Sequence, residues 1–170
     1  LYERGALRAA EEARQAGKVR FIGFTGHKDP SHHLKMLATP FAWDTVQMPI
    51  NVLDAHFRSF QKQVLPQCAD RKIAVLGMKS LSNGIIPREL NLPAEICRRF
   101  ALSLPITSLM CGIKSRENLR QDLAMAQTFA PVTGQELDEL LEKTAAPARD
   151  GKLVTANHLV RGISVRTNPR

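Results

Sequence analysis

The chain has the length and composition of a single globular domain. It contains 170 residues, of which 44% are hydrophobic and 24% are charged, and a chain of this size can bury one core. No apolar run approaches the roughly 20 residues that a membrane-spanning helix requires. The first fifteen residues carry acidic side chains and lack the apolar stretch of a secretory signal, so we expect a cytoplasmic protein.

The net charge of +8 is unevenly distributed and does not favour a nucleic-acid groove. Residues 151–170 hold four basic side chains and no acid, so they carry half of the excess charge. Nucleic-acid grooves interleave basic groups with aromatic rings, and no aromatic residue lies in a basic cluster here. We expect a poorly ordered basic tail, and a salt-sensitive contact between this tail and nucleic acid is the least favoured alternative.

Cysteine and histidine spacing predicts neither disulfides nor a metal site. Cys68, Cys97 and Cys111 form an odd set without a CxxC pair, which is typical of reduced cytoplasmic thiols. His27 and His33 lie close together, but no carboxylate completes a ligand set on one helix face. We therefore predict no metal.

Helical and apolar segments alternate from the N-terminus onward. Residues 3–17 predict a helix, and the apolar run 19–24 predicts a strand that is buried on both faces. Residues 31–38 predict a short helix with Ser31 as its N-cap, and residues 44–48 predict a second strand.

The alternation continues through the rest of the chain. A helix capped by Asp54 is predicted at 54–71, with an interruption at Pro66, and a third strand without polar alternation is predicted at 72–78. A loop is predicted at 80–91, a helix at 93–103 and a strand at 106–111. An amphipathic helix is predicted at 115–128 with Leu119 and Leu123 inward, and a last helix at 133–144 is opened by a capping box of Thr133 and Glu136.

This order of segments predicts an α/β fold with parallel strands. Apolar strands that alternate with amphipathic helices are joined by right-handed crossovers. The GxGxxG fingerprint of open dinucleotide-binding sheets is absent. Four βα units whose strands end in polar or glycine-rich residues predict half of a (β/α)8 TIM barrel instead. We place this partial barrel at residues 1–150 and the basic tail at 151–170.

In such barrels the chemistry lies where the strands end. At the fourth end Gly112 allows close backbone approach, Lys114 supplies a cation and Ser115 stands at the N-cap of the next helix. These features are typical of a phosphate site, and plain helix capping explains them equally well. Gln47 can present its amide to a planar ring or bond a loop, and Met78 can contact a ligand or fill the core.

Four segments together resemble a known family. GKVRFIGFTGHKD, DTVQMPINVLDAHFRSFQKQVLP, IAVLGMKSLSNG and ALSLPITSLMCGIKSRENLRQDL resemble the C-terminal half of an aldo/keto reductase. The likeness is greatest to the bacterial branch of predicted oxidoreductases that carries FTGHK, and it covers about residues 4–150. It implies a fragment of an NAD(P)H-dependent oxidoreductase that reduces aldehydes or ketones to alcohols.

The resemblance also implies a set of cofactor-binding residues. Gly26 and Met78 replace the Asn and Tyr that are common in the family at the nicotinamide end. Asn118 replaces an Arg that binds the 2′-phosphate in many members, so the preference for NADPH over NADH stays open. The implied residues, in order from the nicotinamide through the pyrophosphate to the adenosine, are Thr25, Gly26, Gln47, Met78, Lys79, Leu81, Gly112, Lys114, Ser115, Asn118, Gln121 and Asp122.

The family's catalytic Asp, Tyr, Lys and His belong to the other half of the barrel. The only tyrosine, Tyr2, precedes the first predicted helix and matches no motif, so we assign no catalytic residue. We expect the chain alone to be inactive and to require an N-terminal half-barrel or self-association. The complete enzyme would act on a small-molecule carbonyl substrate. The alternative is a non-catalytic nucleotide-binding or dimerising half-barrel.

Overall fold

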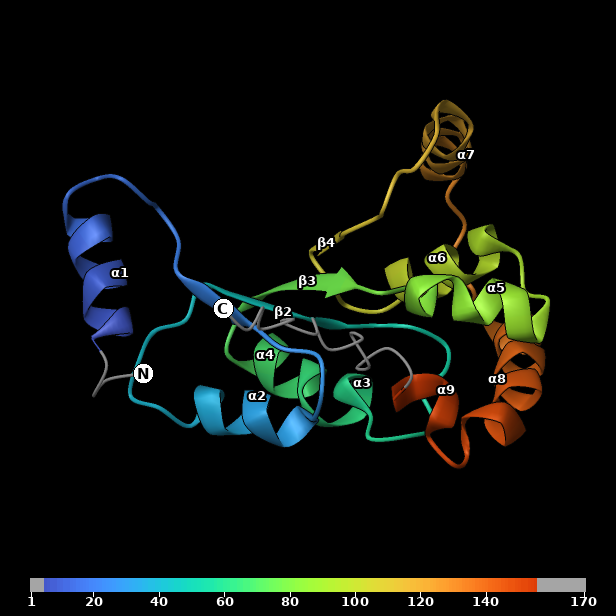
Figure 1. Cartoon of the computed structure of the whole chain (residues 1–170), viewed down its shortest axis with the longest axis horizontal. Coiled ribbons are helices and arrows are strands. Elements are labelled where there is room, and N and C mark those ends of the chain that lie inside the picture. Colours follow the sequence, from blue (N-terminus) through green and yellow to red (C-terminus); the bar gives the residue numbers. More distant parts are fainter. Residues whose placement is uncertain (1–4, 156–170) are drawn as a thin grey trace, which may run out of the picture.

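A sheet of four parallel strands forms the centre of the computed structural model, which describes residues 5–155 (Figure 1). The strands neighbour one another in chain order: β1 Gly23–Thr25, β2 Thr45–Pro49, β3 Ala74–Met78 and β4 Ser108–Leu109. The predicted α/β fold with four parallel strands is therefore confirmed. Most of the predicted basic tail, residues 156–170, lies outside the described residues.

Helices connect and flank these strands. In Figure 1, α2, α3 and α4 run beneath the sheet, and α5, α6 and α8 gather beyond the end of β3. None of the helices within residues 5–155 has the length and apolar character needed to cross a membrane. The helices are α1 Ala6–Gln15, α2 Pro30–Leu37, α3 Phe60–Gln63, α4 Leu65–Asp70, a 3-10 turn η1 Ser82–Gly84, α5 Ile85–Leu90, α6 Ala94–Leu102, α7 Arg116–Gln127, α8 Gly134–Ala148 and α9 Lys152–Thr155.

The sheet is covered more completely on one face than on the other. In β2, Val46 and Met48 are fully buried, whereas the alternate residues Thr45 and Gln47 are only half-buried. The prediction of a strand at 19–24 buried on both faces is wrong, because pairing begins at Gly23 and Phe21 is 63% exposed. Helices pack on one face of these strands, and the described residues leave the other face partly open.

Two apolar clusters hold the helices in place. The first joins β1, β2 and β3 to the helices α1 to α4 and includes the fully buried Val64. The second joins the loop after β2 to α5, α6 and α8 and includes Ile86 and Phe100. The ends of β2 and β3 lie where these clusters meet, so the first residues of the loops after these strands are held by buried apolar side chains.

The short helices start at different residues from those predicted. Asp29, not Ser31, caps α2, because its Oδ1 accepts the Ser31 backbone N–H at 2.8 Å. The helix predicted at 54–71 begins only at Phe60, with Ser59 and not Asp54 as its N-cap, and it is divided into α3 and α4, with Pro66 in the first turn of α4. Pro66 thus marks the interruption, as predicted, but it begins the second helix. The loop predicted at 80–91 contains η1 and α5.

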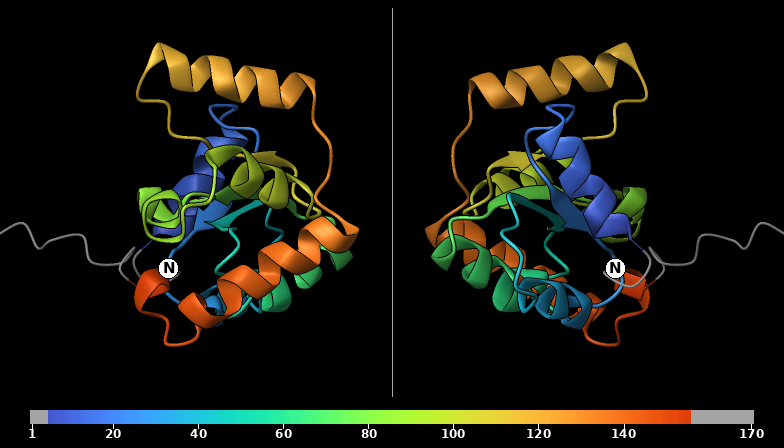
Figure 2. Two further views of the ribbon diagram at one scale, coloured as in Figure 1. Left: turned by 90° about the vertical axis from the view of Figure 1, so that its right-hand side faces the viewer. Right: turned by 90° about the vertical axis from the view of Figure 1, so that its left-hand side faces the viewer.

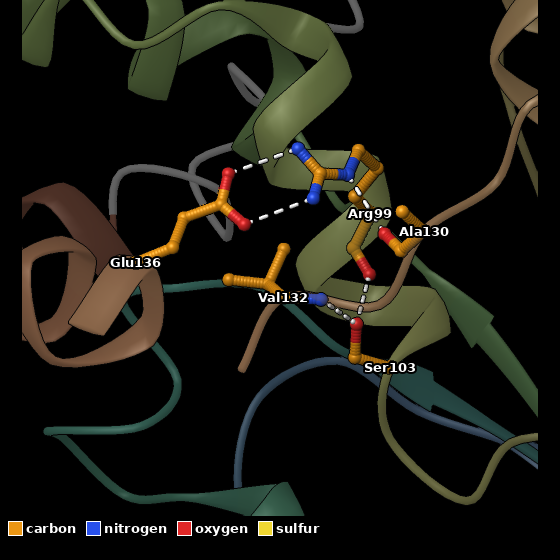
Figure 3. Close-up of polar contacts among 5 residues, drawn as sticks. All are labelled: Arg99, Ser103, Ala130, Val132 and Glu136. Carbon is orange, nitrogen blue, oxygen red and sulfur yellow. Dashed lines mark hydrogen bonds and ion pairs between the residues drawn. The ribbon is translucent and has the colours of Figure 1, made fainter. Parts of the chain in front are cut away.

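The start of α8 is held by α6 and not by a capping box (Figure 3). Both guanidinium NH2 groups of Arg99 donate to the Glu136 carboxylate at 2.9 Å, and Arg99 Nε donates to the Ala130 carbonyl at 2.8 Å. Val132 N donates to Ser103 Oγ at 2.8 Å. The predicted capping box is wrong, because Thr133 makes no side-chain cap and Glu136 is engaged by α6.

The helix α7 stands apart from the sheet on two extended connections (Figures 1 and 2). None of its residues is buried, and Leu119 and Leu123 are 41% and 54% exposed. The prediction that these leucines point inward is wrong for this chain by itself. The apolar side of α7 lacks a partner among residues 5–155.

Candidate cofactor site

The ends of β1 and β2 place two predicted site residues side by side. Thr25 and Gln47 are direct partners in the parallel register, so they lie at the same level of neighbouring strands. Thr25 is exposed and Gln47 is half-buried. Gln47 Nε2 also lies 3.5 Å from Met78 Sδ, which it contacts as a weak donor. Three of the predicted residues thus form a continuous row across the ends of three strands.

Gly26 follows this row and is required by its surroundings. An added Cβ would lie 2.8 Å from Cε1 of His33, inside van der Waals contact. His33 is buried, and its Nε2 lies 3.1 Å from the Gln47 carbonyl oxygen, to which it can donate. Burial lowers the pKa of His33, which favours the neutral ring. His33 is thus a structural residue that supports the strand carrying Gln47.

The loop after β3 holds an unusual backbone conformation. Lys79, Ser82 and Asn83 have φ values of 59°, 50° and 56°, which non-glycine residues rarely adopt. Lys79 Nζ donates to Asn83 Oδ1 at 2.6 Å, and the Lys79 carbonyl accepts from Asn51 Nδ2 at 3.2 Å. Strained backbone of this kind persists where the surrounding structure holds it and is frequent at ligand sites.

This loop forms one wall of a cavity of about 500 Å³ at the ends of β3 and β4. The connection between β4 and α7 and the first turns of α7 form the opposite wall. Seven of the residues that sequence analysis singles out line this cavity: Met78, Lys79, Leu81, Gly112, Lys114, Asn118 and Gln121. Thr25, Gly26 and Gln47 lie outside its lining, at the neighbouring strand ends.

Ser115 caps α7, as the sequence predicts. Its Oγ accepts the backbone N–H of Asn118 at 3.1 Å, so this hydroxyl is used within the helix. Lys114 precedes it and is exposed. The plain capping role of Ser115 is therefore present, and Lys114 places a mobile cation beside the positive end of the helix dipole.

Asp122 forms an ion pair within the chain. Its carboxylate forms a buried ion pair with Arg98 of α6, and the two side chains are 12% and 7% exposed. Arg98 lines the cavity, and its Nε and the Asp122 Oδ2 have no hydrogen-bond partner. This pair ties α7 to α6 and places a guanidinium beside the cavity.

Sequence reasoning missed Arg98, together with Cys111, which also lines the cavity. Arg98 lies in the helix predicted at 93–103, and its acid partner is 24 positions away in the sequence. Burial raises the pKa of Cys111, and Arg98 acts in the opposite direction. A buried arginine of this type leaves no local signal in the sequence.

The polar residues after β1 do not form a second reactive centre. Asp29 caps α2 and pairs with Arg58 at 3.4 Å. Burial, assisted by Lys79, lowers the pKa of His27. No group of histidine, cysteine or acidic side chains in the part of the chain that the structure describes is arranged to hold a metal ion. Tyr2 lies outside the described residues.

Parallel βα units with a cavity at their carboxyl ends define this chain as part of a barrel-type α/β protein. A profile of the aldo/keto reductase family matches residues 4–99, more than half of the chain, so the chain belongs to this family. The profile spans β1 to β3 and most of α6, and the later elements lie beyond it.

Solved structures confirm the fold. The chain is similar to the holo form of aldo-keto reductase AKR11C1 from Bacillus halodurans, with a TM-score of 0.63, 15% identity, and coverage of 80% of this chain and 54% of that one. The apo form gives the same TM-score, identity and share of that chain, with 78% of this chain covered. The chain therefore spans about half the length of these structures. No curated protein gives a significant match.

Proposed function

We propose that this chain is the cofactor-binding, C-terminal half of an NAD(P)H-dependent aldo/keto reductase of the branch that carries FTGHK. The observation that carries the proposal is the cavity at the ends of β3 and β4, which is lined by seven of the cofactor-binding residues that the resemblance implies. The complete enzyme would reduce aldehydes or ketones to alcohols, and the bound cofactor would supply the hydride.

The residues around the cavity fit the adenosine and pyrophosphate parts of NADPH. Lys79 and Lys114 come from opposite walls and would neutralise phosphate charge. Gly112 leaves space near the backbone, since an added Cβ there would meet nothing within 4 Å. Asn118 and Gln121 offer amides to the adenosine, and NADH is the alternative cofactor because neither is an arginine. Leu81 lines the same cavity, and Ser115 lies outside its lining as the N-cap of α7.

The row of Thr25, Gln47 and Met78 would hold the nicotinamide end. Thr25 and Gln47 carry groups that can bond a carboxamide, and Met78 offers a polarisable surface to a ring. Gly26 would act by leaving room for His33 and not by contacting the cofactor. Asp122 would act indirectly, through its ion pair with Arg98, as a residue that positions α7.

The proposed reaction requires groups that this row does not contain. No residue of the chain matches the family's Asp, Tyr and Lys motifs, so we propose that residues 1–150 bind the cofactor and do not turn it over alone. An N-terminal half-barrel or a second copy would complete the barrel. A non-catalytic nucleotide-binding half-barrel is the second candidate, favoured by the same lack of matching motifs.

Titration of NADPH fluorescence with the purified chain tests the site. Lys114→Ala removes a cation next to the α7 N-terminus, and we expect the affinity for NADPH to fall several-fold. Lys35→Ala removes an exposed lysine on α2, remote from the cavity, and should leave the affinity unchanged. Equal affinities of wild type and Lys114→Ala, or no binding at all, would contradict this assignment.

Turnover separates the two candidate functions. Supplying the chain with a separately expressed aldo/keto reductase N-terminal half should give NADPH oxidation in the presence of an aromatic aldehyde if the chain belongs to an enzyme. Binding of NADPH without oxidation in that mixture favours the non-catalytic half-barrel.

A further inference from the structure

The cavity at the ends of β3 and β4 carries more positive charge than a pyrophosphate requires. Among residues 5–155, its lining contains three cationic side chains, Lys79, Arg98 and Lys114, and no acidic one. The two lysines match the two charges of the pyrophosphate in the proposed cofactor. Arg98 therefore remains beside the cavity as a third cation, to which the sequence resemblance assigns no role.

The chain itself uses only part of the Arg98 guanidinium. Its Nη1 donates to Oδ1 of Asp122, and both side chains are buried. Arg98 Nε and the other carboxylate oxygen, Asp122 Oδ2, have no hydrogen-bond partner within the described residues. The two groups are thus joined at one point and lack the two-point geometry that arginine often forms with a carboxylate. A buried donor without a partner is rare, and a bound anion would account for this one.

The carboxylate of Asp122 does not compete with an anion for the cavity. Arg98 belongs to the cavity lining and Asp122 does not. Asp122 therefore holds the guanidinium from outside the cavity and fixes its orientation. Because Arg98 is buried and fastened before a ligand arrives, binding loses little further free energy to desolvation or to the ordering of this side chain.

The helix α7 places this guanidinium at the adenosine end of the proposed site. Asn118 and Asp122 are four residues apart in α7, so they lie one turn apart on the same side of the helix. Asn118 and Gln121 both line the cavity. An Arg98 side chain that is paired with Asp122 therefore lies close to the two amides that would contact the adenosine.

A second cavity between α6 and α7 is less suited to an anion. It has a volume of about 490 Å³ and shares Ala94, Arg98 and Gln121 with the first cavity. Glu95 lines it, and Arg98 is its only cation within residues 5–155. A phosphate would meet an acid there, whereas in the first cavity it would meet three cations.

We propose that Arg98 binds the 2′-phosphate of NADPH and thereby makes the site select NADPH over NADH. This inference rests on the cofactor site proposed above. The 2′-phosphate is a phosphomonoester with a charge of about −1.5 to −2, and NADH carries a hydroxyl group in its place. Asn118 and Gln121 supply no charge, so the guanidinium is the group that distinguishes the two cofactors. Asp122 is a positioning residue, because it acts on the phosphate only through Arg98.

Fluorescence titrations of the 170-residue chain with NADPH and with NADH test the proposal. We expect wild type to bind NADPH about tenfold or more tightly than NADH, because hydrogen bonds to charged groups are strong. Arg98→Lys keeps a cation beside Asp122 but loses the planar fork, so it should weaken NADPH binding several-fold and leave NADH binding nearly unchanged. Arg120→Ala removes an arginine of α7 that is 77% exposed and lies outside the cavity lining, and it should change neither affinity.

The ratio of the two dissociation constants separates a binding role from a structural one. A variant that only loosens α7 would weaken NADPH and NADH alike. The Arg98→Met, Asp122→Leu double variant removes both charges without leaving an unpaired buried carboxylate, and we expect it to bind the two cofactors with similar affinity. If Arg98→Lys loses its far-ultraviolet circular dichroism spectrum, the double variant serves in its place.

The possible failures of this proposal and of the cofactor site can be told apart. Equal affinities of the wild-type chain for NADPH and NADH, or the wild-type ratio in both variants, would overturn the role of Arg98 and leave the cofactor site in place. Binding of neither nucleotide by wild type would overturn both proposals.

Discussion

At the residue scale, Gly26 illustrates how a position in the site is fixed by packing. The His33 ring lies directly where a side chain would go, and this ring is held by the Gln47 carbonyl, by a tilted contact with Phe24 and by an edge contact with Phe60. The sequence places a glycine directly after β1. The structure supplies the reason, because no side chain fits at this strand end beside the buried imidazole.

Replacement of Gly26 by alanine should therefore destabilise the protein. The new Cβ would lie 2.8 Å from His33 Cε1, and overpacking of this kind costs about 1–3 kcal/mol. Gly112→Ala is a matched control, since nothing lies within 4 Å of its Cβ position and its φ is not positive. Urea unfolding of both variants measures the difference. Equal urea midpoints of the two variants would show that the His33 ring moves aside without a measurable loss of stability.

Asp54 is a buried acid with a structural task. Its carboxylate accepts the backbone N–H groups of Phe60 and Gln61 at 2.8 Å each, and Ser59 Oγ donates to it at 3.3 Å. It thereby holds the start of α3. Burial raises the pKa of Asp54 to about 7 and outweighs the opposing effect of these donors.

The raised pKa of Asp54 predicts a loss of stability as pH rises. Between its ordinary value of 3.8 and about 7, the folded protein keeps a proton that the unfolded chain has released, so the free energy of unfolding falls over that window. Asp54→Asn is neutral throughout and should lack this fall. Chemical unfolding at pH 4.5 and 7.5 compares the free energy of unfolding of the two proteins. Histidine titration contributes equally to both, because both contain the same histidines. Parallel pH profiles would contradict the raised pKa.

At the scale of elements, sequence reasoning located the strands better than their ends. Apolar runs placed all four strands, because alternation of apolar and amphipathic segments is a local signal. Only two residues of the run 106–111 pair with β3, and β4 has no strand on its other side among residues 5–155. Pairing length depends on neighbours, and a single segment does not encode its neighbours.

Contacts between helices were the least predictable feature. The pairing of Glu136 with Arg99 and of Asp122 with Arg98 joins residues 37 and 24 positions apart. The local pattern instead assigned Glu136 to a capping box, and the family resemblance implied that Asp122 binds the cofactor. Side-chain partners at that separation follow from the packing of α6, which no local spacing reveals.

The buried pair between α6 and α7 should control the position of α7. Arg98→Met leaves the Asp122 carboxylate buried without its partner, a change that typically costs about 3–5 kcal/mol. We expect lower hydrogen-exchange protection in α7 and partial recovery in the Arg98→Met, Asp122→Leu double variant. Arg120→Ala breaks only an exposed pair with Glu117 and should have little effect. Unchanged exchange in α7 would rule out this fastening role.

At the scale of the whole molecule, the strands have the apolar pattern expected of strands that are buried on both faces. Runs such as IAVLGM lack polar alternation, and that pattern is typical of strands buried on both faces. In the described residues, helices bury one face of β2 and β3 while the alternate residues stay half-buried. The sequence pattern therefore predicts that this face of the strands is buried, whereas in the described residues it is only half-buried.

That disagreement is itself informative about the functional form. The apolar residues that are predicted to be buried and are exposed are confined to two segments: Phe21 lies just before β1, and Leu119 and Leu123 lie on α7. Apolar residues in the two packed clusters, such as Val64 and Ile86, are fully buried. The simplest physical account is that the sequence is suited to a state in which both edges are covered. The cavity beside α7 would then have its outer wall fixed in place by the same contact that closes the sheet.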